Sequence, residues 1–140
     1  MKYLFEVKKD DFVRAGEASS NIKKILRQLG IDTGVIRKVS IAAYEAEMNI
    51  VIHSLGGQIE LEVHPDSVKV TARDEGPGIE DIELAMQEGY STASERVREM
   101  GFGAGMGLPN MKRCSDRFSV NSSHEKGTII TMEVDMKAGD

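Results

Sequence analysis

Glu45 and Asn49 are the first residues whose types and spacing could do chemistry. They lie four residues apart in a segment of helical periodicity, so they share one helix face, and His53 continues that face by another turn. An isolated Glu-x-x-x-Asn is most often an ordinary solvated face. In the functional alternative, the amide oxygen of Asn49 binds Mg²⁺, which prefers oxygen ligands, and Glu45 orients or deprotonates an attacking hydroxyl. His53 is better explained as a hydrogen-bonded residue in the wall of such a site than as a catalyst.

A second candidate is Asp74, which ends a predicted strand and is followed by the segment Gly76-Pro77-Gly78-Ile79. As local structure, Asp-Glu-Gly-Pro-Gly is ordinary turn chemistry. A carboxylate that emerges among core residues is costly unless it is paired, however, and the exocyclic amine of adenine is a suitable donor. Gly76 and Gly78 would leave room for a flat base and its sugar. We therefore expect residues 74–79 to bind the base of a nucleotide.

The third candidate is a glycine run that enters a predicted helix. It comprises Gly101, Gly103, Gly105, Met106, Gly107 and Leu108. A glycine repeat alone could be only a flexible loop. Free N–H groups and the dipole at a helix start favour phosphate, however, so the position of the run indicates a phosphate site. It is not a Walker A loop, because no Gly-Lys-Ser/Thr follows, and no parallel βαβ pattern surrounds it as in a Rossmann site.

Two weaker signals stand beside these motifs. Thr128 enters the last predicted strand after a turn, which is the better explanation alone, but its hydroxyl could lie near Asp74. Ser91, Thr92 and Ser94 are either contacts of a lid or solvated loop residues, and the sequence does not separate these two roles. Taken in order, the three main motifs supply the parts that an ATP site needs.

The elements that must position these residues follow from hydrophobic periodicity. Alternation predicts strands at 3–7, 59–63 and 68–72, the last two forming a hairpin that turns at 65–66. One helix is expected to start at Asp10 or Asp11, with Phe12, Ala15, Ser19, Ile22, Leu26 and Leu29 on its inner face, and to stop at Gly30. A second should run from Asp32 or Thr33 to 53–54 and carry the candidate pair.

The remainder of the chain continues the same pattern. We expect a short helix at 80–88, an aperiodic mobile segment at 89–107, and a third long helix with Pro109 in its first turn. Met111, Cys114 and Phe118 should face inward. Two further strands are predicted at 117–122 and 128–136. The pattern predicts one α+β domain over residues 1–140, with helices on one face of a largely antiparallel sheet.

Bulk properties exclude several function classes. The net charge of −5 argues weakly against nucleic acid and against anionic membranes as partners. Cys114 is the only cysteine, which excludes an internal disulfide and a cysteine-based zinc site, and it is expected to be a small buried hydrophobe. Neither a signal peptide nor a segment of membrane-spanning length stands out, so we expect a cytoplasmic protein.

The ordered motifs resemble those of the GHKL ATPase superfamily, which includes gyrase, histidine kinases and bacterial anti-sigma-factor serine kinases. The N box is similar to Glu45…Asn49, the G1 box to Asp74-x-Gly76-x-Gly78 and the G2 box to Gly103-x-Gly105-x-Gly107. The resemblance covers nearly the whole chain. It implies the Bergerat fold, a two-layer sandwich of three main helices on one face of a mixed, mostly antiparallel sheet, with a mobile ATP lid between the G1 and G2 boxes. It also implies ATP and Mg²⁺ as ligands.

Within the superfamily, the size of the chain is similar to that of stand-alone serine kinases of partner-switching systems. The run 105–116 looks most like that of the stressosome switch kinases. Two residues favour different branches of the superfamily. Gly103 stands where anti-sigma members often carry an arginine that reaches the terminal phosphate, whereas His53 is more typical of the anti-sigma branch.

The resemblance therefore implies a protein serine/threonine kinase that phosphorylates a small STAS-type regulatory protein, with Glu45 as general base. The alternative is an ATP-gated, anti-sigma-factor-like binding module with little or no kinase activity. Plain ATP hydrolysis ranks third, since the chain holds no further domain to harness it. The implied partners are a STAS-domain protein, a sigma factor, or both, and a homodimer is also open.

Overall fold

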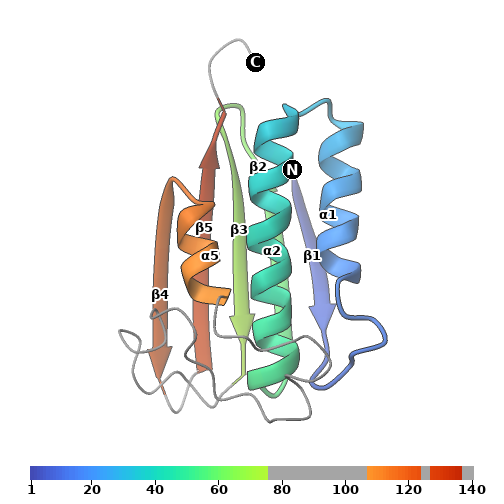
Figure 1. Cartoon of the computed structure of the whole chain (residues 1–140), viewed down its shortest axis with the longest axis vertical. Helices are drawn as coiled ribbons and strands as arrows, with labels where there is room; N and C mark the ends of the chain where they lie inside the picture. The colour runs from blue at the N-terminus through green and yellow to red at the C-terminus, as the bar shows by residue number, and fades with distance from the viewer. Residues whose placement is uncertain (76–106, 124–126, 137–140) are drawn as a thin grey trace.

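The computed structural model describes residues 1–75, 107–123 and 127–136. All three described helices cover the same face of one sheet, which gives two layers (Figure 1). The expected α+β sandwich is confirmed. The elements, in chain order, are β1 (Lys2–Val7), α1 (Glu17–Gln28), α2 (Thr33–His53), β2 (Gly57–Val63), β3 (Ser67–Asp74), α5 (Gly107–Arg113), β4 (Arg117–Ser123) and β5 (Gly127–Asp135).

The five strands follow the order β1-β2-β3-β5-β4, and every neighbouring pair is antiparallel. The described sheet is thus wholly antiparallel, rather than mixed. The predicted hairpin is confirmed: β2 and β3 pair from Val63↔Val68 to Gly57↔Asp74. This register places Asp74 at the end of a central strand, between β2 and β5.

The core fills the space between the sheet and the helices. The inner face of α2 carries apolar residues at helical spacing, and all of them are buried: Val35, Ile36, Val39, Ala42, Ala43, Ala46 and Ile50. Asp32 caps that helix as expected, with its Oδ2 accepting a hydrogen bond from the Gly34 amide at 3.0 Å. Met111 is fully buried, and Cys114 and Phe118 pack against the core. The central helix of the candidate site is therefore fixed by its own amphipathic pattern.

The predicted start of the first helix is wrong. The chain turns through residues 8–16, and α1 begins only at Glu17. Asp10 adopts a positive φ of 56°, and Asp11 accepts a bond from the Arg14 amide in a turn. Phe12 and Ala15 reach the core from this loop. At the other end, Leu29 is the C-terminal cap and 37% exposed rather than buried.

The third helix is also shorter than predicted. It spans only Gly107–Arg113, because the chain must reverse to begin β4. Ser115 Oγ donates to the Met111 carbonyl at 2.7 Å, and the Asp116 amide donates to the Glu133 carbonyl at 2.8 Å. These bonds replace a further helical turn. The helix expected at 80–88 lies outside the described residues. So does the segment expected to be mobile at 89–107, except for Gly107, which is the first residue of α5.

None of the helices in the described part of the chain combines the length and the apolar character needed to cross a bilayer.

Candidate active site

The candidate residues come from segments that converge at one end of the sandwich. Figure 1 shows four segments directed toward the lower end of the molecule: the C-terminal half of α2, the end of β3, the start of β5 and the start of α5. Antiparallel pairing of β3 with β5 requires that one ends where the other begins. Topology thus brings together residues that are more than 50 positions apart.

Asp74 is held in place by the strand beside it. The Thr128 amide donates a hydrogen bond of 2.9 Å to Oδ1 of Asp74. Burial raises the pKa of this carboxyl to about 6, although the Thr128 bond acts in the opposite direction. Within the described chain, Oδ2 of Asp74 accepts no hydrogen bond. A desolvated carboxylate with an unused acceptor fits a ligand that supplies a donor, such as the adenine amine.

Thr128 was a weak candidate in the sequence, and the structure strengthens it. Its side chain is almost fully buried, with 2% of the residue exposed. Its hydroxyl lies 3.0 Å from that of Ser122 on the neighbouring strand, β4. Thr128 therefore contacts Asp74 through its main chain, while Ser122 fixes its side chain. The contact to Asp74 is made by the Thr128 amide, and the expectation that its hydroxyl lies near this carboxylate stays a prediction.

Gly57 permits this arrangement from the other side of Asp74. The two residues are directly paired between β2 and β3. A Cβ atom on Gly57 would collide with the Arg73 carbonyl oxygen and stand 2.8 Å from the Asp74 Cα. Such contacts are closer than real Cβ atoms tolerate, so this position requires glycine. Gly57 was not among the predicted site residues, although a glycine opposite a candidate carboxylate in a predicted hairpin was the available signal.

Glu45 faces the start of α5. Asn110 donates from Nδ2 to Oε1 of Glu45 at 3.3 Å, and the other carboxylate oxygen lies 3.6 Å from where a Cβ on Gly107 would be. Asn110 in turn accepts a bond of 3.3 Å from Arg113. The half-buried carboxylate is thereby tied to the helix that follows the glycine run. Asn110 was missed, since its only signal is its place in the first turn after that run.

The other predicted residues divide into three groups. Asn49 is half-buried on α2, one turn beyond Glu45. Leu108 is buried in the core, so its side chain is packed against protein and only its main chain could meet a ligand. The remaining ones lie outside what the structure describes: the side chain of His53 and all of Gly76, Gly78, Ile79, Ser91, Thr92, Ser94, Gly101, Gly103, Gly105 and Met106.

Glu47 lies between Glu45 and Asn49 on α2, and it has a structural role that was not predicted from the sequence. It is 2% exposed, and its carboxylate accepts hydrogen bonds from the amides of Gly16 at 3.0 Å, Ala18 at 3.2 Å and Ser19 at 3.0 Å. A side chain of α2 thus caps the N-terminus of α1. This explains why α1 begins where it does.

Over the described ranges, no group of three or more His, Cys, Asp or Glu side chains could hold a metal ion. The described site offers an unpaired carboxylate oxygen at Asp74, the carboxylate of Glu45 and, one helical turn beyond Glu45, the half-buried amide of Asn49.

Comparison with known proteins agrees with this arrangement. The family model described as a histidine kinase-like ATPase domain matches residues 10–134. The chain belongs to this family. The match spans α1 through β5, including both halves of the candidate site.

Individual members of the histidine kinase-like ATPase family are also similar. The serine/threonine-protein kinase RsbT of Bacillus subtilis is 36% identical over 124 residues, which is 86% of this chain and 85% of RsbT. An anti-sigma F factor of Caldanaerobacter subterraneus is 30% identical over 94% of this chain and 89% of its own length. A crystal structure of RsbU and RsbW domains from Mycobacterium tuberculosis matches with a TM-score of 0.62 and 15% identity. That match covers 97% of this chain and 34% of the crystallised one, and it shows the shared fold.

Proposed function

We propose that this chain is an ATP-dependent protein serine/threonine kinase of a partner-switching regulatory system. The observation that carries the proposal is the position of Glu45, a half-buried carboxylate held by Asn110 against the first turn of α5. A module that only binds ATP has no need of a carboxylate at that point. The similarity to the RsbT kinase over 86% of the chain supports the same assignment.

Each residue would act on a separate part of the reactants. The ionised carboxylate of Asp74 would accept the adenine amine, beside Thr128 and the segment Gly76, Gly78 and Ile79. The phosphates would lie along Gly101, Gly103, Gly105, Met106 and Gly107, with the main chain of Leu108. His53 would be a wall residue. This division places the transferred phosphoryl group near the start of α5.

Phosphoryl transfer depends chiefly on positioning and charge neutralisation. Glu45 would accept the proton of the Ser or Thr hydroxyl as it attacks, and Asn110 would keep the carboxylate in place. Asn49 would contribute its amide oxygen to Mg²⁺, which supplies neutralisation of phosphate charge. A partner would present the attacking hydroxyl; we propose a STAS-type regulatory protein. The proposal holds equally for a monomer and for a homodimer.

A second candidate is an ATP-gated module that sequesters a sigma factor, with little or no kinase activity. The similarity to anti-sigma F factors favours it. Both candidate functions require ATP binding. They differ in whether Glu45 acts as a general base.

Transfer of label from ATP separates them. Wild-type protein with labelled ATP, Mg²⁺ and the STAS protein encoded beside its gene should label that partner on Ser or Thr. Glu45→Gln should bind ATP normally and transfer nothing. Asp66→Asn is the matched control, because it neutralises a carboxylate in the β2–β3 turn at the opposite end of the sheet and should transfer like wild type. Wild-type protein that binds both partner and nucleotide without transfer would establish the sequestering module instead.

A further inference from the structure

Basic side chains gather where α2 packs against α5, beside Glu45. Lys38 and Arg37 are exposed on α2 and precede Glu45 by seven and eight residues, which is about two helical turns, or roughly 10–12 Å along the helix axis. Arg113 is exposed at the end of α5. We call Arg37, Lys38 and Arg113 the basic patch. Its positive charge is opposite in sign to the net charge of the whole chain, which is −5.

The thiol of Cys114 shows that the three cations gather around one point. Burial raises the pKa of this half-buried thiol, whereas the charges of Lys38, Arg37 and Arg113 act in the opposite direction. The carboxylate of Glu45 also raises the pKa of the thiol. Because charges near a protein surface act over short distances, the basic patch and Glu45 belong to one continuous region of α2 and α5.

Hydrogen bonds connect the basic patch to the proposed general base. Arg113 donates from Nη1 to Oδ1 of Asn110 at 3.3 Å, and Asn110 donates from Nδ2 to Glu45 at 3.3 Å. On α2, Ile41 lies one turn before Glu45 and is 37% exposed. An exposed apolar side chain flanked by charged ones is typical of a protein-binding surface, where apolar contacts are surrounded by a polar rim.

A protein substrate that reaches Glu45 must also cover this region. A stable protein–protein interface covers about 800 Å² on each partner and therefore extends roughly 15 Å from its centre. A substrate centred on Glu45 thus contacts Arg37 and Lys38 as well. We propose that the basic patch docks an acidic surface of the protein that presents the Ser or Thr hydroxyl. This inference rests on the proposed kinase function and adds the charge of the substrate to it.

The position of the patch favours a protein over the phosphates of ATP. The proposed phosphate site lies at the start of α5, at Gly107, whereas Arg113 is the last residue of that helix. Lys38 and Arg37 act on Cys114, which follows Arg113 directly. The basic patch is therefore at the far end of α5 from the phosphate site, and its removal should leave ATP affinity unchanged.

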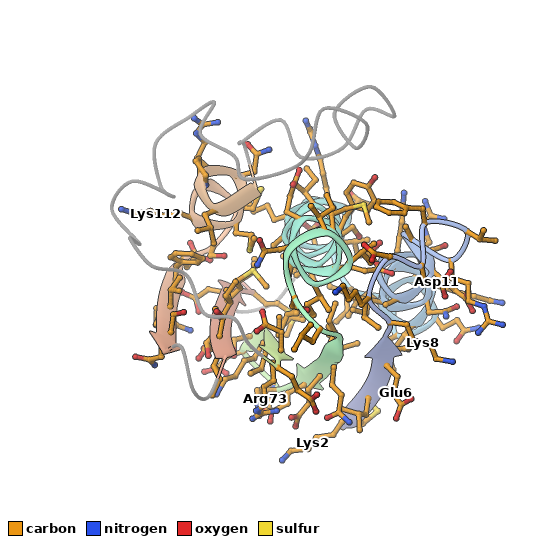
Figure 2. The ribbon with its side chains drawn as sticks, turned by 90° about the horizontal axis from the view of Figure 1, so that it is seen from below. Lys2, Glu6, Lys8, Asp11, Arg73 and Lys112 are labelled. Carbon is orange, nitrogen blue, oxygen red and sulfur yellow. The ribbon has the colours of Figure 1, made fainter. Side chains whose placement is uncertain are left out.

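Charge reversal tests the docking surface through the binding of the partner. Lys38→Glu and Arg37→Glu should each raise the Kd for the STAS protein encoded beside the gene about fivefold or more, and the wild-type Kd should rise with salt. Lys112→Glu is the matched control, because it changes the net charge equally and should bind like wild type. Figure 2 shows Lys112 on the side of α5 that faces away from α2. Isothermal titration calorimetry with a non-hydrolysable ATP analogue bound gives Kd without phosphoryl transfer, and circular dichroism checks the fold of each variant.

The outcomes separate docking from catalysis. An unchanged Kd in both patch variants would overturn the proposal, and so would an equal loss in Lys112→Glu, which would indicate an effect of net charge alone. An equal loss of ATP affinity would assign the cations to the nucleotide and overturn it too. Wild-type protein that binds the partner but transfers no label would refute the kinase function, whereas a raised Kd in Lys38→Glu would still support the acidic docking surface.

Discussion

The main-chain amide of Thr128 donates a 2.9 Å hydrogen bond to Oδ1 of Asp74, across 54 residues of sequence. This bond ties the carboxylate at the end of β3 to the first residues of β5. It orients Asp74 and partly offsets the cost of burying it. The second oxygen of the carboxylate stays available to a ligand.

Nucleotide affinity should depend on the ionisation of Asp74. Its pKa of about 6 in the free protein means that the carboxyl is protonated below that pH and cannot accept the adenine amine as a carboxylate. We expect ATP affinity to fall as pH is lowered through about 6, by at most tenfold per unit. Isothermal titration calorimetry from about pH 5 to about pH 8 gives the profile. Because ATP itself titrates in this range, Asp74→Asn is the reference: it should bind more weakly and lack the extra pH dependence. Equal affinity for both proteins would exclude Asp74 from base binding.

The same residue should destabilise the nucleotide-free protein at neutral pH. Its folded pKa of about 6 is raised above the ordinary value of 3.8, so its favourable contribution is present below 3.8 and lost as pH rises through about 6. Asp74→Asn should therefore unfold at higher urea concentration than wild type near pH 8, with a gain of about 3 kcal/mol at most. The gain should vanish near pH 4. A variant less stable than wild type at both pH values would show that the carboxylate is structurally required.

Asn110 should act on catalysis through Glu45. Asn110→Ala removes the 3.3 Å bond to Oε1 and leaves the carboxylate free to rotate. We expect kcat for label transfer to fall about tenfold, while the affinity for ATP stays unchanged, because the hydrogen bond of Asn110 goes to Glu45, the proposed general base. Lys112→Ala, an exposed change on the same short helix, is the control. An effect on ATP binding equal to that on kcat would mean that Asn110 shapes the nucleotide site instead.

Glu47 should be required for stability rather than for catalysis. Replacement by Ala leaves the amides of Gly16, Ala18 and Ser19 without their acceptor in a largely buried place. We expect a loss of about 3 kcal/mol in the free energy of unfolding, measured by urea titration. Lys24→Ala, on the exposed side of α1, should change that energy by less than about 0.5 kcal/mol. Equal free energies of unfolding for Glu47→Ala and Lys24→Ala would mean that water accepts the hydrogen bonds of the three amides in place of the carboxylate.

The sequence by itself determined the parts whose cause is local. Residues 33–53 carry an apolar stripe at helical spacing behind an Asp cap, so the helix with Glu45 and Asn49 was predictable to within a residue. The hairpin register followed from strict alternation on both strands and from the Pro65-Asp66 turn. In both cases the interactions that fix the element lie within a few positions of one another.

Only the tertiary structure decided what depends on distant partners. The first residue of α1 is set by the hydrogen bonds that Glu47 of α2 accepts from its amides. The helix α5 ends early because the chain turns there into β4 and bonds to β5. The position of Asp74 depends on Thr128 and on the space left by Gly57. Asn110 could be assigned to the candidate site only from its hydrogen bond to Glu45. Periodicity records which face of an element is buried, but it does not record which other element supplies the hydrogen-bond partner there. Those partners are set by packing, and at this site packing joins residues up to 65 positions apart.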